Sequence, residues 1–234
     1  MQKQLIGGIL LISAFALIFS GCAMEQEEVT IDLPEEELSA FMNDDEGSED
    51  ESKGLSSLQR GEWKGLPVYI DYGYFRNHFI PSGWMGDHGD MKFNPNWKEN
   101  PYSRKSCIRV GYTAKSSQGN GWSGVYWQNP ENNWGMRPNV GFDLSSATKL
   151  TFRARGDKGG EIIREFKMGG ISGAYPDSDS ASVGPITLTP EWKEYVINLE
   201  GMDLTYIIGG FCWVVSSMDN PEGIAFYLDD IVYE

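Results

Sequence analysis

Two adjacent aspartates stand within the apolar stretch FYLDDIVYE at residues 226–234. If this stretch is a β-strand, successive side chains point to opposite faces, so Asp229 and Asp230 lie on different faces. Whichever face is buried then holds one carboxylate among apolar neighbours. An unpaired buried carboxylate is so costly that it needs a cation, a basic side chain, hydrogen-bond donors or a proton. The pair is therefore a candidate ion-binding or hydrogen-bonding centre.

A second group of residues has the chemistry of a sugar site. The segment GWSGVYWQNPENNWG contains Tyr126, Trp127 and Trp134, with Asn132 and Asn133 directly before the last of these. Pyranose rings stack their C–H faces on Trp and Tyr, while amide groups satisfy the hydroxyls. Tyr126 and Trp127 point to opposite faces of a strand, so we expect one of them in the core. Trp134 is either an exposed sugar contact or a cap that folds back over the end of the domain.

Charged residues alternate with apolar ones along two further segments. Arg153 and Arg155 share a face of KLTFRAR, and Glu165 and Lys167 share a face of EIIREFKM. The plain interpretation is the solvated outer surface of an antiparallel sheet. The functional interpretation is a binding face, because Arg presents a fixed fork of donors, and paired arginines would suit acidic sugars.

The Gly-rich segment SGWMGDHGDMKF places Trp84, Asp87, His88 and Asp90 close together. One His between two Asp could bind a metal, although a lone His is more often a hydrogen-bonded loop residue. Loops carry binding residues more often than strands do. We interpret this segment as the rim of a binding site rather than as a catalytic centre.

Known catalytic motifs are absent from the sequence. It has no GxSxG, HExxH or GxxxxGK[ST], and its two histidines are His78 and His88. Retaining glycosidases need two carboxylates at a fixed separation. Neither EIIRE nor EWKE has the E-x-D-x-x-E spacing of the laminarinase type. We therefore predict that the protein is not an enzyme, and a site assembled from distant residues is the remaining route to catalysis.

The sequence begins with the pattern of an export signal. Lys3 precedes an apolar run that ends at Phe19, and two small residues lead from there to Cys22. This layout is typical of a secretory signal peptide, and FSGC resembles the lipobox of bacterial lipoproteins, with Phe19 in place of the preferred Leu. The resemblance implies removal of residues 1–21, lipidation of Cys22 and a membrane-anchored location in the cell envelope. A plain transmembrane anchor is the alternative, since the run is almost long enough to span a bilayer.

An acidic linker is predicted at residues 22–59. From Ala23 to Lys53 there are 13 acidic residues and one basic residue, whereas Arg60 to Glu234 carry 21 acidic and 17 basic residues. Most of the formal charge of −15 therefore belongs to the linker. Such a charged segment cannot bury a core, so we predict a disordered spacer. The acidic balance also argues against nucleic acid as a partner.

Residues 60–234 contain all eight Trp and form one domain of ordinary size. Short runs rich in β-branched and aromatic residues, separated by Gly, Pro, Asn and Asp, predict strands and no helix. This pattern favours an all-β antiparallel sandwich of the jelly-roll kind. Cys107 and Cys212 lie in two of the strands, either as a disulfide or as buried free thiols. The predicted strands are 67–75, 107–113, 122–128, 149–155, 161–168, 185–189, 192–198, 206–215 and 224–233.

Four segments carry a resemblance to a known fold, namely GWSGVYWQNPENNWG, FDLSSATKLTFRARGDKGGE, ITLTPEWKEYVINLEGMDL and IAFYLDDIVYE. They resemble the galactose-binding-like jelly rolls of carbohydrate-binding modules, family 11 among them, and the assembly-factor-like domain associated with mitochondrial complex I. The resemblance implies a structural calcium ion at Asp229 or Asp230, with Asp71 as the counterpart near the start of the domain. The alternative is that one Asp faces solvent and the other accepts hydrogen bonds from backbone or from an Arg.

We therefore expect a membrane-anchored, non-catalytic lipoprotein whose jelly roll binds a polysaccharide or oligosaccharide. The first alternative is a structural or assembly module that binds a protein partner through the same face, and the least favoured is a glycan-active enzyme. We also expect residues 226–234 to be paired in a sheet and to close the domain against an early strand around Asp71. The expected sugar contacts are Tyr126, Asn132, Asn133, Trp134, Arg153, Arg155, Glu165 and Lys167.

Overall fold

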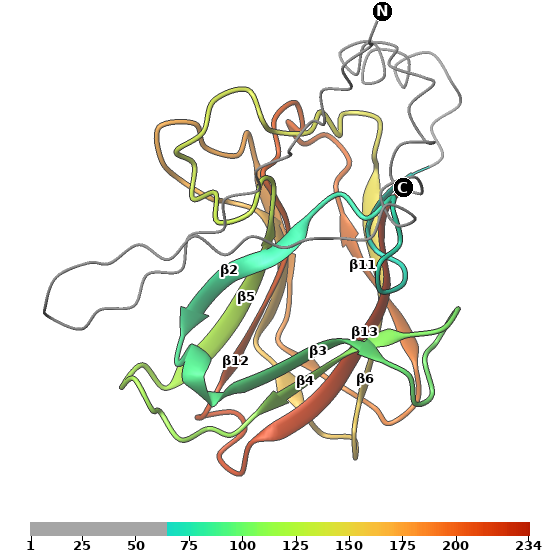
Figure 1. The fold of residues 1–234 in the computed structure, drawn as a ribbon, viewed down its shortest axis with the longest axis vertical. Helices are drawn as coiled ribbons and strands as arrows, with labels where there is room; N and C mark the ends of the chain where they lie inside the picture. The colour runs from blue at the N-terminus through green and yellow to red at the C-terminus, as the bar shows by residue number, and fades with distance from the viewer. Residues whose placement is uncertain (1–64) are drawn as a thin grey trace, which may run out of the picture. The chain divides into compact units, whose positions relative to one another are not determined.

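The computed structural model describes residues 65–234, which form an antiparallel β-sandwich with no α-helix (Figure 1). The predicted all-β jelly-roll class is confirmed. Nowhere in this described part is there a helix that is long and apolar enough to cross a membrane. The predicted signal peptide, the lipidated Cys22 and the acidic linker of residues 22–59 lie outside the described residues, so they stay predictions.

Sheet A is six-stranded. It consists of β1 (Leu66–Tyr69), β3 (Met91–Trp97), β4 (Cys107–Tyr112), β6 (Lys149–Gly156), β11 (Lys193–Asn198) and β13 (Ile224–Tyr233). The strand order is β11–β6–β13–β4–β3, and β1 pairs with β13 beside this path. The prediction for residues 226–234 is confirmed, because β13 is paired along its length and Leu66 of β1 lies opposite Tyr233.

Sheet B is five-stranded. It consists of β2 (Ile80–Gly86), β5 (Trp122–Gln128), β8 (Glu165–Gly169), β9 (Ser180–Val183) and β12 (Gly209–Ser216), in the order β2–β5–β12–β8–β9. In Figure 1, β2, β5 and β12 run side by side in one layer, while β3, β4, β13 and β6 form the other. A short ladder of β7 (Ile162–Ile163) and β10 (Ile186–Thr187) and one 3-10 turn, η1 (His88–Asp90), complete the described elements.

The core fills the space between the two sheets. The ring centroid of Phe152 in sheet A lies 4.6 Å from the ring centroid of Phe166 and 5.3 Å from that of Phe211. Phe166 and Phe211 both belong to sheet B. The hydroxyl of Tyr233 donates to the carbonyl oxygen of Gly210 across the sheets, with 2.6 Å between the oxygens. Alternate residues of each strand therefore point inward, and the residues between them form two outer faces.

Several strand predictions need correction. Three strands were not predicted at all, namely β2, β3 and β9. The strand predicted at 67–75 ends at Tyr69, and the one predicted at 161–168 is divided into β7 and β8 around Arg164. The two cysteines of the described residues are both free and buried, so the free-thiol alternative holds for Cys107 and Cys212.

Candidate functional site

The outer face of sheet B presents two rows of side chains across its three central strands. The strand register places Tyr126 of β5 opposite Cys212 of β12, which lies opposite Lys167 of β8. Adjacent strands are about 4.8 Å apart, so each row spans roughly 10 Å. The second row is parallel to the first and consists of Gly124, Val214 and Glu165.

Trp134 lies over one end of the first row. Its ring makes an edge-to-face contact with Tyr126, with 6.0 Å between the ring centroids and 83° between the ring planes. The Tyr126 side chain is buried, and its hydroxyl donates to the carbonyl oxygen of Gly169 at 3.1 Å. Trp134 remains 41% exposed. Tyr126 is thus a buried support, and Trp134 is an exposed ring beside it. Trp127 belongs to the core, as we expected for one of the two aromatic residues of this strand.

The loop that carries Trp134 is held by internal hydrogen bonds. The side-chain oxygen of buried Asn133 accepts N–H bonds from Met136 at 3.1 Å and Arg137 at 3.3 Å, and its amide nitrogen donates to the carbonyl oxygen of Asn129 at 3.0 Å. Asn133 is therefore a loop-positioning residue, and the prediction that its amide contacts a sugar needs correction. Asn132 is exposed and lies beside Trp134, so its side chain is free for such a contact.

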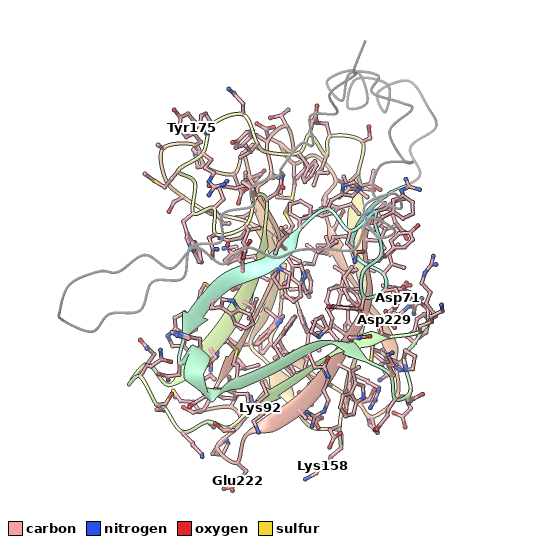
Figure 2. All side chains as sticks on the ribbon, in the orientation of Figure 1. Asp71, Lys92, Lys158, Tyr175, Glu222 and Asp229 are labelled. Atoms are coloured by element: carbon pink, nitrogen blue, oxygen red, sulfur yellow. The ribbon has the colours of Figure 1, made fainter. Side chains whose placement is uncertain are left out.

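A second loop packs against the first. The backbone N–H of Tyr175, between β8 and β9, donates to the carbonyl oxygen of Gly135 at 2.8 Å. At Gly135 the φ angle is +75°, and an added Cβ would lie 2.1 Å from the carbonyl oxygen of Ser172. Only Gly fits so close an approach between the two loops. Their contact fixes the position of Trp134, which directly precedes Gly135. Tyr175 is 43% exposed and marks this end of the domain in Figure 2.

Charges flank the aromatic pair. Lys167 and Glu165 are half-buried on β8, on the far side of β12 from Tyr126. Nearby Asp177 accepts backbone N–H bonds from Ile171 at 2.8 Å and Gly209 at 3.1 Å. Burial raises the pKa of Asp177, although these hydrogen bonds and the positive charge of Lys167 oppose the shift.

Sequence reasoning missed the apolar residues between these groups. The Met85 and Val214 side chains flank Gly124, where an added Cβ would lie 3.0 Å from Met85 Cε and 3.3 Å from Val214 Cγ2. Cys212 lies in the same surface and is buried. The alternation in GFCWVV could have placed Cys212 and Val214 together on one face, but the sheet to which that face belongs was not evident.

The structure does not bring Arg153 and Arg155 to this surface. Both lie on β6, on the outer face of sheet A, across the whole sandwich from Trp134. Arg155 is buried, with its guanidinium carbon 3.6 Å from the ring centroid of Tyr227 and 5.2 Å from that of Trp192. The single predicted sugar site therefore divides into two groups of residues on opposite faces.

The predicted acidic centre is held by hydrogen bonds. Asp229 is fully buried, and its Oδ2 accepts the backbone N–H groups of Tyr102 at 2.9 Å and Ser103 at 3.1 Å. The Ser103 hydroxyl donates to Asp230 at 2.7 Å, and the Ser106 hydroxyl donates to Asp71. The carboxylates thus have hydrogen-bond donors, which are the predicted alternative to calcium.

Asp71 and Asp229 lie on the same side of the domain in Figure 2. Burial raises the pKa of Tyr69, and the charges of Asp229 and Asp71 add to the shift. Calcium takes six to eight oxygen ligands. Among residues 65–234, no three His, Cys, Asp or Glu side chains come together in a way that could hold a metal ion. Because their oxygens already accept N–H and O–H bonds, the donor set of Asp71, Asp229 and Asp230 fits calcium poorly, and the ion remains an untested prediction.

The Gly-rich segment around His88 closes the opposite end of β5. Buried Asp87 accepts backbone N–H bonds from Gly121 at 2.6 Å, Gln118 at 2.8 Å and Asn120 at 3.1 Å. Burial works to raise the pKa of Asp87, but these backbone hydrogen bonds outweigh it and lower the pKa. The segment is therefore a hydrogen-bonded turn at the start of β5, whereas Trp134 follows the end of that strand. The interpretation of this segment as the rim of the binding site is corrected accordingly.

Comparisons with protein-family models and with curated proteins give no match. Among solved structures, a family 30 carbohydrate-binding module is 16% identical, with 73% of this chain and 98% of that chain covered and a TM-score of 0.50. A family 11 module of a cellulosomal cellulase of Clostridium thermocellum is 15% identical, with coverages of 74% and 95% and a TM-score of 0.45.

A family 11 module from the same organism, in complex with a β-1,3-1,4-mixed-linked tetrasaccharide, is 16% identical, with coverages of 72% and 95% and a TM-score of 0.44. These likenesses concern the fold. Together with the order of the strands and the two packed antiparallel sheets, the likeness to the family 30 module shows that residues 65–234 have the jelly-roll fold of carbohydrate-binding modules.

Proposed function

We propose that the domain binds a carbohydrate through the outer face of sheet B. The observation that carries this proposal is the exposed ring of Trp134, held edge-on against Tyr126 by two interlocked loops. A pyranose ring could stack on Trp134 and extend along the row towards Lys167 and Glu165, which offer a donor and an acceptor for hydroxyl groups. Beside this row, the apolar side chains of Met85 and Val214 cover Gly124.

The same surface favours binding over hydrolysis. Among the outward-facing residues of β5, β8 and β12, Glu165 is the one carboxylate. Glycosidases use a pair of carboxylates on either side of the scissile bond. Asp177 is near but uses its oxygens for backbone N–H bonds. We therefore propose a non-catalytic binding module.

We also propose that lipidated Cys22 anchors the protein to a membrane of the cell envelope, and that residues 22–59 space the domain from it. This part rests on the sequence, through the apolar run that ends in FSGC and the acidic residues that follow. Detergent-phase partitioning of the full chain tests it. The wild-type chain should enter the detergent phase, and a Cys22→Ser variant should not be processed or lipidated. Equal mature masses for the two chains would contradict the anchor.

Affinity gel electrophoresis tests the sugar site, with mixed-linked β-glucan and other neutral and acidic polysaccharides in the gel. Stacking on one aromatic ring is worth about 1.5 kcal/mol, so Trp134→Ala should weaken retention about tenfold. Trp84→Ala is the matched control, because Trp84 is 42% exposed but packs against Phe93 of the core. It should lower stability and leave retention unchanged.

Two results would contradict the proposal. One is the absence of retention of the wild-type chain on every glycan. The other is equal retention of the wild-type and Trp134→Ala chains, which would move binding away from this face. If no glycan is retained but a protein partner binds in a Trp134-dependent way, the alternative of an assembly module holds instead.

A further inference from the structure

A cavity of about 470 Å³ opens on the outer face of sheet A, across the sandwich from Trp134. Its volume lies within the range of small-molecule sites, which is about 300 to 1,000 Å³. Strands β6, β11 and β13 form the floor, and the loop before β4 forms one wall. The polar residues that line it are Ser103, Arg104, Thr151, Arg153, Glu194, Asp230 and Glu234.

Both signs of charge meet in this cavity. The guanidinium of Arg153 lies 2.6 Å from the carboxylate of Glu194, and its face covers the ring of Tyr102 with 4.4 Å to the centroid. Glu234 is paired at 2.6 Å with Lys149, which lies outside the lining. The cavity therefore offers fixed N–H donors and carboxylate acceptors within one small volume.

The backbone at the cavity is shaped to present Asp230. The register of β13 against β6 shifts between Asp229 and Val232, which makes a bulge in a strand that lies between two neighbours. Asp230 has a φ angle of +42°, and Arg104 on the opposite wall has +50°. Bulges redirect side chains near binding sites, and a left-handed conformation at a residue other than Gly is costly. The neighbouring Asp229 holds the bulge by accepting backbone N–H bonds from the wall loop.

We propose that this cavity is a second ligand site, for one or two neutral sugar units. A hydroxyl group both donates and accepts, so a polyol can bridge the carboxylates of Glu194 and Asp230 and the guanidinium of Arg153. A small cation would meet Arg104 and Arg153, and a small anion would meet the carboxylates, so an ion of either sign is disfavoured. The side chains of Ile70 and Val232 in the lining give the apolar C–H face of a sugar a surface to contact.

This inference does not rest on the site at Trp134, because the two faces share no residue. The test uses the full chain with Trp134→Ala, which weakens binding at sheet B, and saturation-transfer NMR with glucose, galactose, mannose, xylose and cellobiose as probes. We expect at least one of these sugars to give a saturation signal. Asp230→Asn, a change that the left-handed backbone tolerates, should reduce that signal at least fivefold.

Arg153→Lys should reduce it similarly, because Lys cannot reproduce the fixed fork of donors. The matched control is Arg164→Lys, since Arg164 is also paired with a carboxylate, Asp219 at 2.8 Å, but lies outside the cavity. It should leave the signal unchanged. The inference is overturned if no probe gives a signal, or if the signal survives both Asp230→Asn and Arg153→Lys in chains that still melt cooperatively.

Discussion

The backbone N–H of Tyr102 donates a hydrogen bond to the buried carboxylate of Asp229, with 2.9 Å between nitrogen and Oδ2. Ser103 donates to the same oxygen, and the backbone N–H of Asp230 donates to Oδ1 at 2.9 Å. The loop before β4 is thereby attached to β13, although the two are far apart in the sequence. Among residues 65–234, the hydrogen bonds that Asp229 accepts all come from backbone N–H groups, and burial still disfavours its charged form.

The stability of the domain should fall as the pH rises from about 4 to about 7. Burial raises the pKa of Asp229 from 3.8 to about 7. The charge of Asp230 also raises this pKa, whereas the backbone hydrogen bonds to Asp229 lower it. In this window the folded state keeps a proton that the unfolded state has lost, so rising pH favours unfolding. Thermal melting between pH 4.5 and 8 measures the effect, and the fall should be smaller in Asp229→Asn. An identical pH profile for the two proteins would contradict the assignment.

Removal of calcium should leave the melting temperature unchanged at fixed pH. The reason is that the oxygens of Asp71, Asp229 and Asp230 already accept N–H or O–H bonds. Melting in a chelator and in millimolar calcium is the measurement. A higher melting temperature in calcium, lost in Asp230→Asn, would show that the ion binds the folded state and adds stability by mass action.

Tyr233→Phe should destabilise the domain by about 1 to 3 kcal/mol, because it removes a buried hydrogen-bond partner from the carbonyl of Gly210. The midpoint of urea unfolding should fall while its slope stays the same. Tyr195→Phe is the control, since Tyr195 stacks on Phe152 and the structure records no hydrogen bond of its hydroxyl within the described residues. Equal midpoints for wild type and Tyr233→Phe would show that the bond contributes nothing.

The two thiols should be unreactive until the domain unfolds. Cys107 and Cys212 point outward from different sheets, and packed sheets lie about 10 Å apart, which exceeds the reach of a disulfide. Burial raises the pKa of the Cys107 thiol to about 12, so little thiolate forms at neutral pH. Iodoacetamide should label both residues in denaturant and neither in buffer. A disulfide-linked pair of peptides in the mass spectrum would refute the free-thiol state.

Strands at the sheet centres could be predicted from the sequence, whereas among the edge strands β11 was predicted and three others were not. The predicted segments 122–128 and 224–233 coincide with β5 and β13, which pair on both sides. By contrast, β2, β3 and β9 all lie at sheet edges. An edge strand pairs on one side, so it tolerates residues such as Pro81 and Pro95 that suppress the strand pattern.

For the candidate site, the sequence predicted which side chains lie together within one strand or loop, but not which strands come together. Tyr126 and Trp134 are close in the sequence, and the alternation rule correctly put Glu165 and Lys167 on one face. The same rule put Arg153 and Arg155 together but could not say which sheet their strand joins, because pairing partners are set by contacts between distant segments. That information became available only with the strand order.

The central place of β13 has a consequence for how the protein is made. Residues 224–233 lie between β4 and β6, so sheet A is divided into two parts until the ribosome has added them. The strands on either side cannot complete the sandwich on their own, and each new pairing closes a long loop, which slows folding. The domain therefore cannot complete sheet A until residues 224–233 have been synthesised.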